Sequence, residues 1–445
     1  MNEQSEVRVA LTGAGGGFGR TVLLALSRHP TQRPSVLCDL DTGAVRTLLA
    51  DLGYAAPVRI CASAPEVRDA VAEGAIAIVA DVDLVDPQSF DVLVEATGSV
   101  PVSARVTLAA VAAGRSVVMV SKETEATVGP ALRHRARAHG AVIHAGAGDQ
   151  PANLAALVRW SRDLGLEIVA AGKSSEYDLV LDLDAASVSL LDVTAPATGL
   201  VEQWQLGDDV RAAVTARQTA TAGLKLRAAA DYCEMTVAAN LTGLRIDTPE
   251  MHYPILRTVE LADALRLRED GGLLQQCGAI DVFTSLRRAD EASFAGGEFV
   301  VVRVADREVA DLLAAKGHVV SRTRDLLCIG LPFHLMGLEI PRTIAAAYAR
   351  MPERLPDAPL VSMLARTTQA LPSGHRFAVA GHHHEIAGTH PWLHTGDVAG
   401  AVPYYALDGA RLRRDVAPGH LLQMDDVDGV APVVLELLAE QHTAS

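Results

Sequence analysis

Short apolar runs alternate with stretches of helical periodicity through the first third of the chain. Strands that alternate with helices predict a parallel, doubly wound sheet with helices on both faces. The predicted strands are residues 7–13, 34–41, 75–81, 91–98, 116–121 and 141–148. We therefore expect residues 1–150 to form one α/β domain.

The pattern changes twice after residue 150. An amphipathic helix at 153–165 and an apolar strand at 297–306 predict a second α/β domain over residues 151–351. We expect its last helix, 341–351, to pack back on the first domain. From 352 to 445, short strand-like pieces separated by Gly, Pro and His predict a small module that is mostly β.

Charge and composition narrow the range of partners. The net charge of −15 disfavours nucleic acid and anionic membranes as ligands, because both are negatively charged. The five cysteines form no C-x-x-C pair, which is typical of a reducing compartment. No signal peptide or apolar run of membrane-spanning length is recognisable. We expect a cytoplasmic protein that acts on a small-molecule substrate, with no nucleic-acid or membrane partner.

A glycine-rich loop follows the first predicted strand and opens a helix. Gly13, Gly16 and Gly19 have the spacing G-x-x-G-x-x-G, and Phe18 stands where a strict G-x-G-x-x-G motif has its last glycine. Such a loop lets the backbone approach a pyrophosphate at the N-terminus of the helix. The context predicts a Rossmann-type domain that binds NAD or NADP.

An acidic residue is expected at the end of the second strand, where it would contact the ribose of the cofactor. Asp39 lies about 20 residues after Gly19 and fits this role, which slightly favours NAD. Arg46 is the residue that would accommodate the phosphate of NADP, and Asp41 fits a helix cap. The predicted cofactor-binding residues are Gly13, Gly15, Gly16, Phe18, Gly19, Asp39, Ala96, Thr97, Gly98 and Lys122.

Two lysines are candidates for proton transfer. Hydride transfer to a ketone creates an alkoxide that needs a proton from a group within hydrogen-bond reach. Lys122 follows a predicted strand at the carboxyl edge of the first sheet, where a surface lysine is the alternative. Lys173 follows a buried strand, and we expect it to form a charged cluster with Glu176 and Asp178. A solvated loop with internal ion pairs is the alternative there.

Asp149 and Glu234 complete the predicted catalytic set of Lys122, Lys173, Asp149, Glu176 and Glu234. Asp149 lies where the chain crosses between domains and would orient a substrate hydroxyl or a lysine, or cap the next helix. Glu234 lies in an apolar helix, so it is either a buried structural partner or a substrate ligand.

Histidines occur in a row at 382–384, but no cysteine accompanies them. A polar loop is a better interpretation than a zinc site, and we predict no metal ligands. The expected fold class is α/β: a Rossmann-type doubly wound parallel sheet, a second α/β catalytic domain and a small β-rich C-terminal module.

Several motifs together resemble a known family. The glycine loop, residues 94–98 (Val-Glu-Ala-Thr-Gly) and residues 121–123 (Ser-Lys-Glu) resemble homoserine dehydrogenase-type enzymes. The last triplet is also similar to the Asn-Lys-Glu of deoxyxylulose phosphate reductoisomerase. A match along most of the chain resembles homoserine dehydrogenase-like oxidoreductases with a C-terminal SAF domain. The motifs of this longer match are residues 148–151, 171–173, 234–235, 239–243, 333–335, 339–341, 414–419 and 425–427.

The resemblance implies an NAD(P)-dependent oxidoreductase, a homodimer joined through the second domain and an SAF-like C-terminal module. Its substrate would be a small polar hydroxy or keto compound, phosphorylated or not. One alternative is a reductoisomerase-like enzyme, the only case in which a divalent metal is expected. Another is a non-catalytic sensor that binds NAD(P).

Overall fold

The computed structural model describes residues 6–353, 355–356, 358–396 and 398–444. Its first part is a seven-stranded parallel sheet in the order β3-β4-β2-β1-β5-β6-β7. The strands are β1 (Val7–Thr12), β2 (Gln32–Cys38), β3 (Val58–Ile60), β4 (Ile76–Val79), β5 (Val92–Glu95), β6 (Ser116–Met119) and β7 (Ile143–Ala145). The strand order reverses between β1 and β5, which makes the sheet doubly wound and confirms the predicted Rossmann-type fold.

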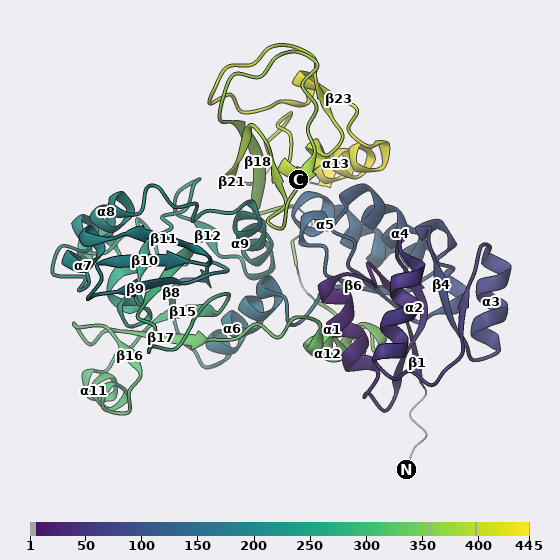
Figure 1. Ribbon diagram of the computed structural model, residues 1–445, viewed down its shortest axis with the longest axis horizontal. Coiled ribbons are helices and arrows are strands. Elements are labelled where there is room, and N and C mark those ends of the chain that lie inside the picture. Colours follow the sequence, from purple (N-terminus) through teal and green to yellow (C-terminus); the bar gives the residue numbers. More distant parts are fainter. Residues whose placement is uncertain (1–5, 354, 357, 397, 445) are drawn as a thin grey trace.

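Helices cover both faces of this sheet (Figure 1). They are α1 (Gly17–Leu26), α2 (Thr42–Asp51), α3 (Ala64–Ala72), α4 (Val100–Ala112) and α5 (Lys122–Ala138). Strands β4, β5 and β6 are buried at every position, as expected where helices pack on both sides of a sheet. Strand β3 was not predicted from the sequence, because this short edge strand is largely exposed and has no continuous apolar run.

The second part is a mixed sheet in the order β11-β10-β9-β14-β8-β15-β17-β16, with β12 and β13 also paired to β14. Its strands are β8 (Ile168–Ser174), β9 (Leu179–Asp182), β10 (Ser187–Leu190), β11 (Val193–Pro196), β12 (Arg245–Ile246), β13 (Ile255–Leu256), β14 (Ala279–Arg287), β15 (Glu298–Arg303), β16 (Val319–Val320) and β17 (Leu326–Leu331). Its helices are α6 (Gln150–Asp163), α7 (Thr198–Glu202), α8 (Val210–Ala220), α9 (Ala229–Thr242), α10 (Leu261–Ala264) and α11 (Arg307–Ala315). Helices α6 and α9 pack on each other and on this sheet, and α9 also contacts α5, so they lie between the two sheets (Figure 1).

The chain then returns to the first domain through η5 (Met336–Glu339) and α12 (Ile340–Tyr348). Ile340, Ile344 and Ala347 are fully buried in the same apolar core as Val9 and Val94. The predicted packing of this helix on the first domain is confirmed. The return fixes η5 against α1, close to the glycine loop.

The C-terminal module lies above the junction of the two larger parts (Figure 1). Its strands are β18 (Val361–Thr367), β19 (Val379–Ala380), β20 (Glu385–Ile386), β21 (Thr389–Thr395), β22 (Arg411–Leu412) and β23 (Val427–Asp428). They form antiparallel pairs, in agreement with the predicted β-rich character. A helix that the sequence analysis did not predict, α13 (Pro432–Ala444), packs on α4 and α5. Within the described ranges, no helix combines the length and apolarity needed to cross a bilayer.

Candidate active site

The glycine loop is packed so closely that two of its glycines admit no side chain. Gly13 has φ +66°, and a Cβ there would lie 2.2 Å from the carbonyl oxygen of Ala96. A Cβ on Gly19 would lie 2.5 Å from the carbonyl oxygen of Gly13. Gly16 precedes α1 without a side-chain cap, so the first N–H groups of the helix face an exposed loop. Uncapped N–H groups at a helix N-terminus commonly bind phosphate groups.

Asp39 lies directly after β2 and faces the glycine loop. Its Oδ2 accepts a hydrogen bond of 2.8 Å from the backbone N–H of Gly15. Asp41 instead caps α2 by accepting a hydrogen bond of 2.9 Å from the N–H of Ala44. The two carboxylates therefore have different positions, and Asp39 is the one beside the predicted nucleotide site.

Buried Glu95 holds the turn after β5 in place. Its carboxylate accepts hydrogen bonds from the N–H of Thr97 at 3.0 Å and from the hydroxyl of Ser103 at 2.6 Å. The N–H of Gly98 donates to the hydroxyl of Ser121 at 2.8 Å, which ties this turn to the end of β6. Ala96, Thr97 and Gly98 thus lie at the carboxyl edge of the sheet, next to Lys122. This edge is where ligands of open α/β sheets bind.

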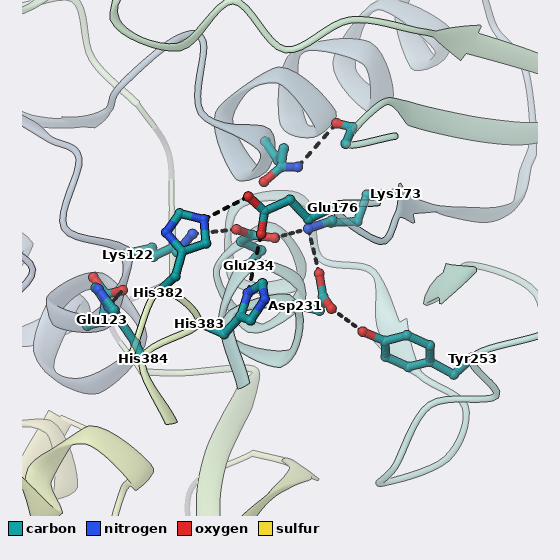
Figure 2. Close-up of polar contacts among 12 residues, drawn as sticks. Lys122, Glu123, Lys173, Glu176, Asp231, Glu234, Tyr253, His382, His383 and His384 are labelled. Carbon is teal, nitrogen blue, oxygen red and sulfur yellow. Dashed lines mark hydrogen bonds and ion pairs between the residues drawn. The ribbon is translucent and has the colours of Figure 1, made fainter. Parts of the chain in front are cut away.

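A network of buried charges joins the two larger domains (Figure 2). Lys122 is the first residue of α5, and its Nζ pairs with Oε1 of Glu234 in α9. The other carboxylate oxygen of Glu234 pairs with Nζ of Lys173 in β8. The same Nζ lies 2.7 Å from Oδ1 of Asp231, and the hydroxyl of Tyr253 donates to Oδ2 of Asp231. Glu234 is therefore shared by one lysine from each domain.

Each charge in this network stabilises the ionised form of the oppositely charged group beside it. Burial opposes ionisation of Glu234, but Lys122 and Lys173 lower its pKa to about 2. Burial also opposes the charge on Lys122, but the carboxylates of Glu234, Asp149 and Glu123 raise its pKa. Opposite charges at short range in a low dielectric have this effect. At neutral pH the cluster consists of two ammonium groups held by carboxylates.

Asp149 stands at the N-cap position of α6, but its side chain makes no capping hydrogen bond. The alternative of a side-chain capping role is therefore wrong. Burial raises the pKa of Asp149, and the nearby charge of Lys122 opposes this rise. Gly148 places this turn against the returning chain, since a Cβ on Gly148 would lie 1.8 Å from the carbonyl oxygen of Met336.

Glu298 is a buried acid that the sequence analysis did not single out. It lies opposite Lys173 in the antiparallel register of β15 and β8, so both side chains extend from the same face of the sheet. Its side chain is completely buried, and neither carboxylate oxygen has a hydrogen-bond partner. Burial raises its pKa to about 9. A glutamate at the start of a strongly apolar strand was the signal in the sequence.

The predicted cluster of Lys173, Glu176 and Asp178 does not form. Asp178 pairs with Arg287 at 2.6 Å, and Glu176 is half-exposed beside two histidines. The reason is the direction of the side chains: Lys173 is inside β8 and extends toward α9, whereas the other two follow the end of the strand. Asp231 and Glu234 take the places next to Lys173, and Tyr253 holds Asp231 from its other side. The sequence analysis missed Asp231 and Tyr253.

Asn240 has a structural role, although it lies in the same helix as Glu234. Its Oδ1 accepts hydrogen bonds from the N–H groups of Leu360 and Val361 at 2.8 and 2.9 Å. Its amide donates to the carbonyl of Val361 at 3.0 Å. The residue thus fastens the C-terminal module to α9.

The row of histidines lies in a loop of the C-terminal module. Of the two larger domains, His382 and His383 contact Glu176, and His384 contacts Glu123. Among the residues that the structure describes, no group of three or more His, Cys, Asp or Glu is placed to hold a metal ion.

The middle of the chain matches a known protein family. Residues 148–340 match the family described as "Oxidoreductase DRL, catalytic domain". This range contains Asp149, Lys173, Asp231, Glu234 and Glu298. A search of curated proteins found no match.

The likeness to solved structures is distant. A probable dehydrogenase from Thermotoga maritima is 12% identical, with 79% of this chain and 91% of that chain covered and a TM-score of 0.40. GenD2 from gentamicin A biosynthesis, in complex with NAD, is 16% identical, with 78% and 88% covered and a TM-score of 0.36. The 1-deoxy-D-xylulose 5-phosphate reductoisomerase from Zymomonas mobilis, in complex with NADPH, is 17% identical with a TM-score of 0.28. The match covers 39% of this chain and spans about half of the reductoisomerase, 46% of its length.

Residues 148–340 thus match an oxidoreductase catalytic domain, in a chain whose first part is a Rossmann-type sheet.

Proposed function

We propose that the enzyme transfers a hydride between NAD(P) and a small polar hydroxy or keto compound held beside Lys122. The observation that carries this proposal is the position of Glu234. This carboxylate pairs Lys122, at the cofactor edge of the first sheet, with Lys173 of the catalytic domain. A hydride and a proton must reach neighbouring atoms of one substrate, so a polar cluster at the junction of the two domains fits this chemistry.

The two lysines have different tasks in this proposal. The side chain of Lys122 is 21% exposed, whereas that of Lys173 is 2% exposed. Nζ of Lys122 can donate a hydrogen bond to the substrate oxygen and stabilise negative charge on it. Lys173 is a fixed charge that holds Glu234 and Asp231 in position. Because the carboxylates raise the pKa of Lys122, its ammonium group keeps its proton.

Asp149 is the group that we assign to proton exchange. Burial raises its pKa, and a carboxyl group with a raised pKa is better matched to acid–base work near neutral pH. It lies near Lys122, whose charge acts on it directly. In the direction of reduction, Asp149 would give its proton to the substrate oxygen while Lys122 holds that oxygen.

The first domain has the features that a dinucleotide needs, and the bound nicotinamide would supply or accept the hydride. The N–H groups at the start of α1 would hold the pyrophosphate, and Asp39 would accept hydrogen bonds from the ribose hydroxyls. A carboxylate at this place repels a 2′-phosphate, so we propose NAD as the preferred cofactor. Arg46 is exposed on α2 and is the residue to examine if NADP is preferred.

A fluorescence titration of the purified protein with NADH and NADPH tests this assignment. We expect NADH to bind about tenfold more tightly, a difference of about 1.4 kcal/mol. Asp39→Ser is expected to remove most of that preference with only a small change in melting temperature, since Asp39 is half-buried at the loop. Tighter binding of NADPH by the wild type would contradict the role of Asp39.

A screen of hydroxy and keto compounds with the preferred cofactor then tests catalysis. Lys122→Met should abolish turnover while cofactor binding persists, because the lysine acts on the substrate oxygen in this proposal. Turnover that is lost with a chelator and restored by Mg²⁺ would favour the reductoisomerase-like alternative, to which we assign no step. Cofactor binding without turnover on any compound would favour the NAD(P) sensor.

The finer family assignment is part of the same proposal. We propose a homoserine dehydrogenase-like enzyme with an SAF-like C-terminal module, on the motifs that carry the resemblance. A cytoplasmic location and self-association through the second domain remain predictions. Light scattering at micromolar protein tests the second of these, and a monomer mass would contradict it.

A further inference from the structure

A loop of the C-terminal module contacts both of the larger domains at their junction. Residues 381–384, here called the histidine loop, connect β19 to β20. Nδ1 of His384 lies 2.6 Å from Oε1 of Glu123 at the start of α5. On the other side, His382 and His383 lie 2.8 and 3.2 Å from the carboxylate of Glu176, just after β8 (Figure 2). The histidine loop therefore contacts both domains that bound the active site.

His384 also packs against the turn that we assign to the cofactor. A Cβ on Gly98 would lie 3.2 Å from Cε1 of His384, so the glycine leaves room for the imidazole. His384 itself has φ +51°, in the left-handed region that residues other than glycine rarely adopt. Such a conformation persists only where the surrounding contacts hold it, and it is common at ligand clamps and active sites.

Glu123 connects His384 to the proposed site. It is adjacent to Lys122 in the first turn of α5, and its side chain is only 3% exposed. Its negative charge is one of the causes that raise the pKa of Lys122. The hydrogen bond from His384 thus decides where this buried carboxylate lies relative to the ammonium group of Lys122.

We propose that the histidine loop closes the active site and that His384 is a positioning residue, which orients Lys122 through Glu123. This inference rests on the proposed function, because it adds a residue of the C-terminal module to that site. This proposal gives the C-terminal module a role in the reaction. Substrate would enter when the histidine loop releases Glu123 and Glu176. The closed loop would then exclude water from the site.

The contact depends on the protonation of His384. The hydrogen bond to Glu123 raises the pKa of His384, while partial burial and the charge of Lys122 oppose this rise. The charged groups that act on His384 are Glu123 and Lys122 from α5. Glu176 after β8 faces the neighbouring His382 and His383, and Lys225, Arg227 and Asp231 line the pocket beside His383. The turn at Gly98 adds no charge. A protonated imidazole is held by Glu123, so the loop is closed below the raised pKa and loosens as the pH increases through it.

Chemical labelling of lysines tests the proposal without any substrate. The full-length protein is treated briefly with acetic anhydride, and mass spectrometry gives the labelling of Lys122 relative to exposed Lys316. In His384→Gln we expect this ratio to increase by about threefold, the change expected when one partly exposed ion pair is lost. His394→Gln is the matched control, because His394 is exposed in the same module and away from the histidine loop. It should leave the ratio unchanged.

The pH dependence of the labelling ratio distinguishes a positioning role of His384 from a loss of structure in the variant. In the wild type the ratio should increase between about pH 6 and about pH 9, and His384→Gln should remove this dependence. The double variant His382→Gln/His383→Gln releases the loop from Glu176 and should also increase the ratio. Equal ratios in the wild type and both variants would overturn the proposal. A wild type that binds neither NADH nor NADPH would contradict the proposed function, while the labelling still reports on the loop.

Discussion

A buried lysine is stable in this protein because carboxylates surround its ammonium group. Lys173 contacts Asp231 and Glu234, and these acids have second partners in Tyr253 and Lys122. Removing charges from water costs several kcal/mol for each ion, and only close partners offset that cost. Each member of the network therefore depends on the others, so loss of one leaves an uncompensated charge.

Lys173→Met is expected to destabilise the protein by about 3–5 kcal/mol, because it leaves two buried carboxylates facing each other. Urea unfolding followed by circular dichroism measures this change. Lys316→Met is the control, since Lys316 is exposed, and it should stay within about 0.5 kcal/mol of the wild type. Equal urea midpoints for the two variants would contradict the proposed contribution of the buried charge network to stability.

Because the carboxyl group of Glu298 is buried, we expect the stability of the protein to decrease as the pH increases. Its pKa in the folded protein is about 9, against an ordinary value of 4.5. Between these values the folded state keeps a proton that the unfolded state has lost, so stability decreases as the pH increases, by up to about 1.4 kcal/mol per pH unit. Glu298→Gln removes this loss.

The melting temperature of Glu298→Gln should therefore increase relative to the wild type as the pH is increased from about 5 to about 8. Glu308→Gln, at an exposed position in α11, should show no such trend. A constant difference between Glu298→Gln and the wild type across this range would mean that Glu298 ionises in the folded protein.

At the scale of elements, the site is built from the ends of strands and the starts of helices. The glycine loop joins β1 to α1, the turn at Gly98 joins β5 to α4, and Lys122 opens α5 after β6. The carboxyl ends of these parallel strands meet at one edge of the sheet, so residues distant in the sequence become neighbours. The loops between them can be short only where glycine permits a close approach of the backbone.

Gly13→Ala should disrupt the loop, because a Cβ would meet the carbonyl of Ala96 at 2.2 Å and φ is +66°. We expect a loss of about 2 kcal/mol or more in stability, and a large loss of NADH affinity. Gly17→Ala is the matched control, since a Cβ there has no atom within 4 Å and α1 has already begun. It should melt at the wild-type temperature. Equal thermal shifts in the two variants would contradict the role given to Gly13.

At the scale of the whole molecule, the C-terminal module is fastened across the junction of the other two parts. Helix α13 packs on α4 and α5 of the first domain, and Asn240 of the second domain holds the start of β18. The histidine loop adds contacts with both domains. The module therefore contacts both parts of the chain that contribute residues to the candidate site.

Asn240→Ala removes the acceptor of two backbone N–H groups and should destabilise this attachment by about 2 kcal/mol or more. We expect faster proteolytic cleavage of the segment before β18, measured by mass spectrometry of the fragments under native conditions. Thr215→Ala, at an exposed position on α8, is the control and should leave the cleavage rate unchanged. Unchanged cleavage in Asn240→Ala would mean that the other contacts of the module hold it in place without Asn240.

The order of strands and helices in the first domain, the glycine loop and Asp39 followed from the sequence by itself, because apolar periodicity and turn chemistry are local properties of the chain. Lys122, Lys173 and Glu234 were also recognised as unusual, since charged residues beside buried strands and in apolar helices are expensive. Short β3 and helix α13 were missed.

Only the tertiary structure decided which charges meet. Glu176 and Asp178 are close to Lys173 along the chain, yet the partners of Lys173 are Asp231 and Glu234, 58 and 61 positions away. Lys173 inside β8 extends toward α9, whereas Glu176 and Asp178 after its end do not, so nearness in sequence is a poor guide to contact. The pairing of Lys122 with Glu234, across 112 positions, depends on how α5 of the first part packs against α9 of the second. That packing is set by the complementary surfaces of α5, α6 and α9, which no local pattern records.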